Sequence, residues 1–120
     1  MFITLVALSL QSAVFSEPAG RYVAEAATGQ CQLVLGEPGR TAPGSLVTPD
    51  AVSGLAYARP GCSLALREAA LWRLERDEAG VEHLSLFDLA GQPVWAGETA
   101  ESGWRGTGPD GQAVSLRRGR

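Results

Sequence analysis

Apolar and polar residues alternate along the second half of the chain with the period of two that is typical of β-strands. In residues 72–76, Trp72 and Leu74 fall on one face and charged side chains fall on the other. The other predicted strands of this half are residues 81–87, 93–97, 104–107 and 113–117. The same alternation directs further apolar side chains into the core, namely Leu84, Leu86, Val114 and Leu116.

Short segments that contain glycine and aspartate separate these strands. They are residues 77–80, 88–92 and 108–111. Glycine accepts the positive φ that tight turns require, and an aspartate such as Asp88 caps backbone amides in a turn. Neighbouring strands should therefore pair as antiparallel hairpins.

The first half of the chain is less regular but also favours strands. The stretches expected to form them are residues 21–25, 30–35, a weak strand at 45–48, and 54–58. Alternation in the second stretch directs Cys31, Leu33 and Leu35 to the inner face. Prolines and glycines in residues 37–44 end that strand and form an exposed loop. Residues 63–70 have a helix-forming composition and should form a short helix or turn.

These elements predict an all-β protein with a single domain. The 120 residues are 45% hydrophobic and 19% charged, which is typical of a globular domain. About eight strands with short connections favour a small antiparallel up-and-down β-barrel with one disulfide. Closure leaves no exposed strand edge, and side chains can fill a barrel of this size. A small β-sandwich is the alternative.

The first sixteen residues carry no charge and predict a secretory signal peptide. Their apolar core of roughly nine residues is shorter than the ~20 that a transmembrane helix needs. The side chains of Val14 and Ser16 place the expected cleavage before Glu17. The predicted organisation is a signal peptide at residues 1–16 and a β-barrel at residues 17–120. The alternative is an ordered N-terminal segment that stays and packs on the barrel.

Cys31 and Cys62 are the chain's only cysteines. In an exported protein, an even pair without further metal-binding residues predicts a disulfide. A zinc site would need three or four ligands, and His83 is the only histidine. A domain of this size buries a modest core, so a cross-link that contributes about 3.5 kcal/mol is a large part of its stability.

The sequence offers few candidates for catalysis. His83 alternates outward on its strand without an expected nucleophile or carboxylate beside it, which predicts a solvated strand histidine rather than a base. Asp77, Glu78 and Asp88 fit turn chemistry. The chain contains no phosphate-binding loop, metal signature or nucleophile elbow. We therefore expect neither an enzyme nor a cofactor.

Trp72, Trp95 and Trp104 are expected to belong to the core, because each buries a large area and its indole N–H needs only one partner. The alternative is that they line a ligand cavity, as in a lipocalin-like carrier. Ten arginines are scattered among thirteen acidic residues, and the net charge is -3. This pattern predicts no continuous basic face for nucleic acid.

An ordered set of motifs carries a resemblance to a known family. The motifs are Gly20-Arg-Tyr22, Cys31-Gln-Leu-Val-Leu35, Cys62, Leu71-Trp-Arg-Leu74, Leu84-Ser-Leu-Phe-Asp88, Gly91-Gln-Pro-Val94 and Gly111-Gln-Ala-Val-Ser-Leu-Arg117. Together they resemble the bacterial alkaline protease inhibitor family over nearly all of residues 17–120. One departure is Tyr22, where the family motif usually has tryptophan.

The resemblance implies a small periplasmic or secreted β-barrel that inhibits a secreted serralysin-type zinc metalloprotease. Related domains occur in an outer-membrane lipoprotein, but no cysteine follows the apolar segment here to take a lipid. The resemblance implies a protease as partner, with no nucleic acid, no transmembrane span and no metal or cofactor of its own. We expect a monomer. The rival hypotheses are the carrier and an envelope structural or stress protein.

In the characterised inhibitors of this family, an extended N-terminal trunk of about ten residues enters the protease cleft. Cleavage before Glu17 would leave only Glu17, Pro18 and Ala19 ahead of the barrel, a reach of roughly 10 Å at ~3.5 Å per residue. If residues 9–16 are retained, a trunk of suitable length exists. Its tip would then lie near Ser9 or Ser12.

Overall fold

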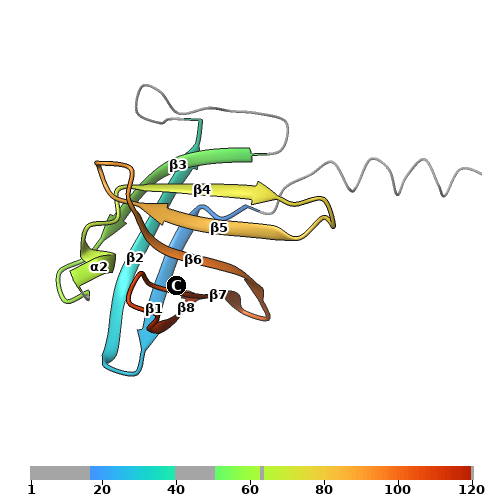
Figure 1. Cartoon of the computed structure of the whole chain (residues 1–120). Helices are drawn as coiled ribbons and strands as arrows, with labels where there is room; N and C mark the ends of the chain where they lie inside the picture. The colour runs from blue at the N-terminus through green and yellow to red at the C-terminus, as the bar shows by residue number, and fades with distance from the viewer. Residues whose placement is uncertain (1–16, 40–50, 63, 120) are drawn as a thin grey trace, which may run out of the picture.

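Eight antiparallel strands close into a barrel in the order of the sequence (Figure 1). The computed structural model describes residues 17–39, 51–62 and 64–119. The strands are β1 (Gly20–Ala26), β2 (Gly29–Pro38), β3 (Ala51–Ala58), β4 (Leu71–Arg76), β5 (Glu82–Phe87), β6 (Pro93–Ala100), β7 (Gly103–Thr107) and β8 (Ala113–Arg118). Each strand pairs with its neighbours, and β8 returns to pair with β1. The predicted all-β barrel is confirmed.

The connection between β3 and β4 contains the predicted short helix. It is the single turn α2 (Leu64–Arg67) within the expected residues 63–70. It ends early because the next residues join the sheet: the N–H of Ala70 donates to the carbonyl of Phe87 at 2.8 Å, and the carbonyl of Ala70 accepts from Ala56 at 2.8 Å. The strand expected at 54–58 begins at Ala51. The weak strand expected at 45–48 lies outside the described residues.

Three hairpins use the predicted turn chemistry. Asp77 and Asp88 each accept two backbone N–H groups of their own turn, at 2.8–2.9 Å. Gly80, Gly91 and Gly111 take φ values of 84°, 83° and 82°, which only glycine adopts without strain. These local interactions fix the length of each turn and hence the register of the strands that follow it.

The predicted inward positions fill the barrel. Side chains that are at most 1% exposed include Tyr22, Leu33, Leu35, Trp72, Leu74, Leu84, Leu86, Trp95 and Leu116. Each indole N–H has one acceptor: the carbonyl of Gly36 at 2.9 Å for Trp72, the carbonyl of Val114 at 3.0 Å for Trp95, and the hydroxyl of Tyr22 at 3.4 Å for Trp104. The tryptophans are core residues, as predicted.

Two strand glycines make room for the tryptophan rings. A Cβ atom on Gly54 would lie 2.5 Å from Nε1 of Trp72, and one on Gly97 would lie 2.6 Å from the ring of Trp95. Real Cβ atoms do not approach ring atoms this closely, so a side chain at either position would displace the indole. The rings therefore lie flat across the sheet only because these glycines are present.

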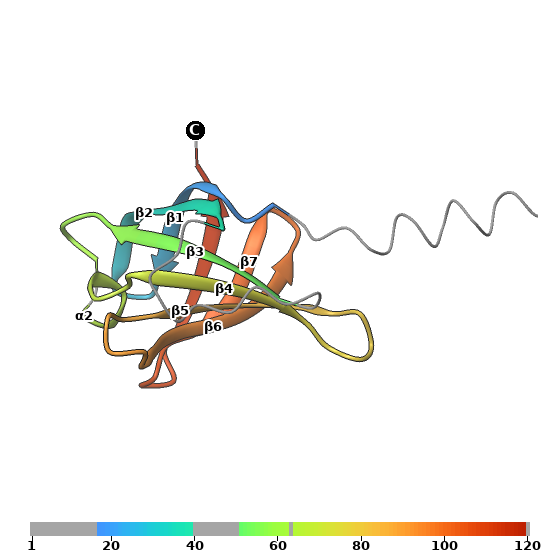
Figure 2. The ribbon, with the colours of Figure 1, turned by 90° about the horizontal axis from the view of Figure 1, so that it is seen from above.

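The disulfide joins Cys31 at the start of β2 to Cys62 in the connection that carries α2, with a Cα–Cα distance of 5.0 Å. The predicted cross-link is confirmed. It holds α2 over one end of the barrel, where Leu66 is only 3% exposed. Residues 17–19, which precede β1, lie at the other end of the barrel (Figure 2).

Candidate functional site

The first and last strands of the barrel meet where the N-terminal segment joins β1. Tyr22 of β1 and Arg118 of β8 are partners in the β1–β8 ladder. Barrel closure therefore brings Arg118 beside residues that precede it by about a hundred positions. Tyr22, Trp104 and Arg118 together hold residues 17–19, and we call these three side chains the N-terminal clamp.

Tyr22 holds the segment from inside the barrel. Its hydroxyl donates to the carbonyl of Pro18 at 2.6 Å, and it accepts the indole N–H of Trp104 at 3.4 Å. Burial raises the pKa of the Tyr22 phenol, although the Trp104 hydrogen bond and the Arg118 charge oppose this, so the hydroxyl stays a neutral donor. A tryptophan, usual here in the resembling family, could donate a hydrogen bond but not accept one.

Arg118 holds the segment from outside. Its guanidinium donates to the carbonyl of Ala19 at 3.1 Å and to the carbonyl of Glu17. The same guanidinium lies 5.1 Å from the centre of the Tyr22 ring, within the range of a cation–π contact. Arg118 therefore ties the segment and the clamp tyrosine together.

The clamp binds main-chain atoms and leaves the Glu17 side chain exposed. Of the predicted contact residues, Pro18 is buried, while Glu17 and Ala19 are attached through their carbonyls. These three residues are thus the fixed base of the N-terminal segment rather than a loose stub. Ser9 and Ser12 lie outside the described residues.

His83 has a partner that the sequence did not predict. Its Nε2 lies 2.8 Å from Oδ2 of Asp77, and its Nδ1 lies 3.7 Å from Oε1 of Glu98. The expectation that no carboxylate lies beside it was wrong, because the turn folds Asp77 back onto the strand. The imidazole is nevertheless 40% exposed, and the pair closes a hairpin. The prediction of an exposed strand histidine therefore stands.

This pair leads to a prediction about pH. The hydrogen bond to Asp77 raises the pKa of His83 above its ordinary 6.5, and the same bond lowers the pKa of Asp77 below 3.8. The histidine stabilises the fold fully below pH 6.5 and loses this contribution as pH rises through its raised pKa. The aspartate contributes above pH 3.8 and loses this as pH falls through its lowered pKa.

An NMR titration of the imidazole should therefore give a pKa above 6.5 in the wild type and a lower value in Asp77→Asn. Asparagine can still cap the turn, so the comparison isolates the charge. Glu98→Gln is the matched control and should change the pKa less, because Glu98 is the more distant carboxylate. Equal values in the wild type and Asp77→Asn would contradict this assignment.

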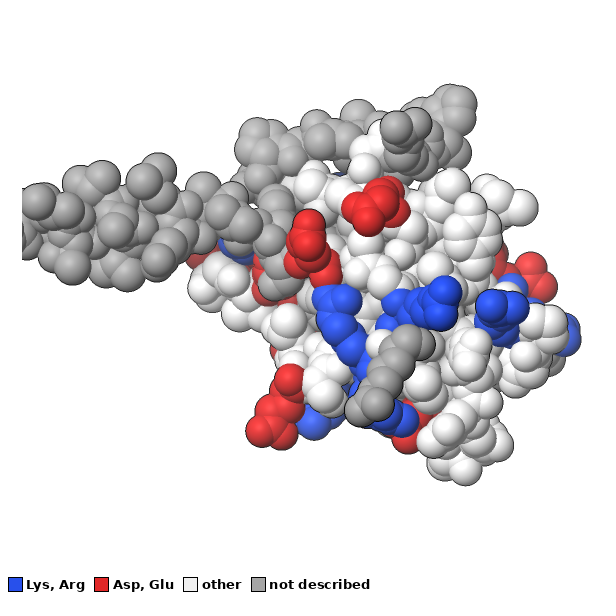
Figure 3. All heavy atoms as spheres, turned by 180° about the vertical axis from the view of Figure 1, so that it is seen from behind, with Lys and Arg blue, Asp and Glu red and all other residues white. Residues whose placement is uncertain are grey.

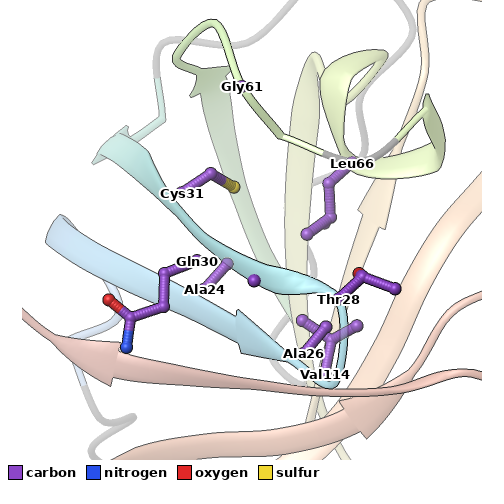
Figure 4. A pocket seen from close by; sticks show the side chains of 9 residues that line it. Ala24, Ala26, Thr28, Gln30, Cys31, Gly61, Leu66 and Val114 are labelled. Carbon is purple, nitrogen blue, oxygen red and sulfur yellow. The ribbon is translucent and has the colours of Figure 1, made fainter.

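The carrier hypothesis requires a cavity, and two hollows of the described barrel lie on either side of Leu66. One of about 140 Å³ lies near the disulfide, where Leu66 reaches into it from α2 (Figure 4). A neighbouring hollow of about 270 Å³ lies on the Trp95 side of Leu66. Pockets for small-molecule ligands usually have about 300–1,000 Å³. Both hollows are smaller than a usual ligand pocket.

Two other kinds of site were sought in the described part of the chain. No group of three or more His, Cys, Asp or Glu side chains there could hold a metal ion. No helix among those residues has the length and apolar character needed to cross a membrane.

Comparisons with known proteins complete the description of the site. No family model matches the sequence, and a search of curated proteins found no significant match. The resemblance to the alkaline protease inhibitors stays a prediction.

Proposed function

We propose that this protein inhibits a secreted zinc metalloprotease of the serralysin type by presenting its N-terminal segment from the end of the barrel. The observation that carries this proposal is the N-terminal clamp. It fixes residues 17–19 by their carbonyls on a closed barrel. The family resemblance supports the same conclusion.

The clamp suits this task because it reduces the entropy lost on binding. A loose terminus must be ordered when it enters a cleft, whereas a segment whose base is already fixed loses less freedom. An extended chain can then form main-chain hydrogen bonds in a substrate groove. Its terminal amine or a carboxylate can replace the water at the open position of a catalytic zinc.

The clamp also bears on which residues enter the cleft. Since residues 17–19 are attached to the barrel, the reach beyond it comes from residues before Glu17. Cleavage before Glu17 would leave only its own amine and side chain to contact the protease. Insertion deep into the cleft would therefore require the longer form, in which Ser9 or Ser12 lies near the tip, whereas the signal-peptide prediction gives the shorter one. The intact mass of the native protein distinguishes the two forms.

The proposed location is the periplasm or the extracellular space. The Cys31–Cys62 disulfide fits an oxidising compartment, where such bonds persist. We propose that the protein acts as a monomer without a cofactor. No specific observation favours the carrier or the envelope structural protein.

Inhibition kinetics test the proposal. The full chain should block a serralysin-type protease at near-stoichiometric concentration, and a variant that begins at Gly20 should inhibit at least about 100-fold more weakly, because the inserted residues carry most contacts in the complex. The truncation removes three carbonyl acceptors, that of Pro18 from Tyr22 and those of Glu17 and Ala19 from Arg118, so the free energy of unfolding should fall by about 1–3 kcal/mol.

Arg118→Gln is the informative point variant. It keeps the segment but removes the guanidinium that holds two of its carbonyls, so inhibition should weaken by a smaller factor than on truncation. Full inhibition by the truncated chain would instead locate the site on the barrel. Inhibition by neither form, together with tight binding of an apolar fluorescent ligand, would favour the carrier.

A further inference from the structure

The outer wall formed by β1, β2 and β3 carries two exposed arginines and an exposed tyrosine. Arg21, Val34 and Tyr57 lie side by side across the three strands. Arg59 follows β3, and its backbone N–H donates to the carbonyl of Gln32 at 2.9 Å. The side chain of Tyr57 is 57% exposed. We call Arg21, Val34, Tyr57 and Arg59 the basic wall, and Figure 3 shows arginines gathered on this face.

The charges of the basic wall are uncompensated. No carboxylate among the described residues pairs with Arg21 or Arg59, and both side chains are exposed beside a shallow hollow of about 100 Å³. Three other arginines have acidic partners: Arg73 lies 3.3 Å from Glu75, Arg76 3.6 Å from Glu82, and Arg117 2.8 Å from Glu25. Free guanidinium groups remain available to an external anionic group.

The opposite side of the barrel carries more acidic than basic side chains, since only Arg73 and Arg76 of β4 stand against five carboxylates there. Strands β4, β5 and β6 and their turn carry Glu75, Asp77, Glu78, Glu82 and Glu98, and Figure 2 places β5 and β6 across the barrel from β1 and β2. The protein has a net charge of -3, and Arg21 and Arg59 of the basic wall lie across the barrel from this group of acids. Such a separation orients a molecule in the field of a charged partner.

We propose that the basic wall docks against an acidic surface beside the cleft of the inhibited protease. This inference rests on the proposed function. The wall begins at Arg21, next to Gly20 where the clamped segment joins β1, so a partner that receives the segment meets the wall. Arginine and tyrosine over partly buried valine are also typical of the centre of protein interfaces. The adjacency favours the protease over an anionic membrane.

Docking of this kind acts on the rate of association. Long-range attraction between complementary surfaces raises the association rate constant and leaves dissociation largely to the close contacts of the inserted segment. Added salt screens exposed charges over about 10 Å at 0.1 M, so the rate should fall as ionic strength rises. This grouping is not visible in the sequence, because Arg21 and Arg59 are distant along the chain.

The test compares two double variants with equal charge. Arg21→Gln/Arg59→Gln removes two charges from the basic wall, and Arg67→Gln/Arg105→Gln removes two exposed arginines elsewhere on the barrel. Association with a purified serralysin-type protease is followed at low and at physiological salt. The first variant should associate about tenfold more slowly at low salt and show a weaker salt dependence. The control should stay within about twofold of the wild type.

Each other outcome overturns the inference. Equally slow association of both double variants would mean that the rate depends on the net charge of the inhibitor and not on the basic wall. An unchanged association rate in Arg21→Gln/Arg59→Gln, while the wild type inhibits, would show that the basic wall is not a docking surface. The proposed function would remain intact. Sedimentation of the wild type, but not the wall variant, with anionic phospholipid vesicles and without an effect on inhibition would make the wall a membrane surface. Lack of inhibition by the wild type would reject the proposed function itself.

Discussion

Replacing Trp72 by alanine should lower the free energy of unfolding by about 3–5 kcal/mol. The indole is fully buried, and its N–H donates to the carbonyl of Gly36 at 2.9 Å. Alanine leaves a cavity across the barrel and a carbonyl without its donor. Denaturant unfolding monitored by circular dichroism measures the loss, which is large for a domain whose total stability is about 5–15 kcal/mol.

Two further variants separate the causes of this loss. Trp72→Phe keeps most of the side-chain volume but removes the indole N–H. The free energy of unfolding should therefore fall by about 1 kcal/mol, the contribution of one hydrogen bond. Gly54→Ala should destabilise the wild type, because its Cβ would lie 2.5 Å from the indole nitrogen, and much less so when Trp72 is already alanine. Additive effects of Gly54→Ala and Trp72→Ala would contradict the packing described here.

Removing the disulfide with Cys31→Ser/Cys62→Ser should cost about 3.5 kcal/mol. The bond closes a loop over a sequence separation of 31 and restricts the unfolded chain. For a domain of this size the loss lowers the melting temperature by about 15–25 °C. Thermal unfolding of the oxidised wild type and of the double variant measures the difference.

The position of the disulfide separates its effect on stability from any effect on inhibition. The disulfide lies at the α2 end, and the N-terminal clamp lies at the other. The folded fraction of the double variant should therefore inhibit as the wild type does, while chemical reduction of the wild type should reproduce the lower melting temperature. A double variant that is as stable as the wild type would show that the bond does not constrain the fold. A double variant that folds but no longer inhibits would show that the disulfide affects the N-terminal clamp at the opposite end of the barrel.

Local sequence chemistry determined the strands, their inner faces and the turns. Alternation directed residues such as Trp72 and Leu84 inward, and the aspartates and glycines of the hairpins determined where the strands reverse. These features depend on residues a few positions apart, for which period and turn propensity are sufficient. The pairing of Cys31 with Cys62 followed because no other cysteine exists.

The tertiary structure alone decided how distant residues meet. Pairing of β1 with β8 brings Arg118 to the carbonyls of Glu17 and Ala19, and it brings Tyr22 close to Trp104. It also decided that Gly54 underlies an indole ring. Such contacts depend on the register and closure of the whole barrel, which no local pattern specifies. The barrel was therefore predictable from the sequence, whereas the N-terminal clamp and the basic wall were not.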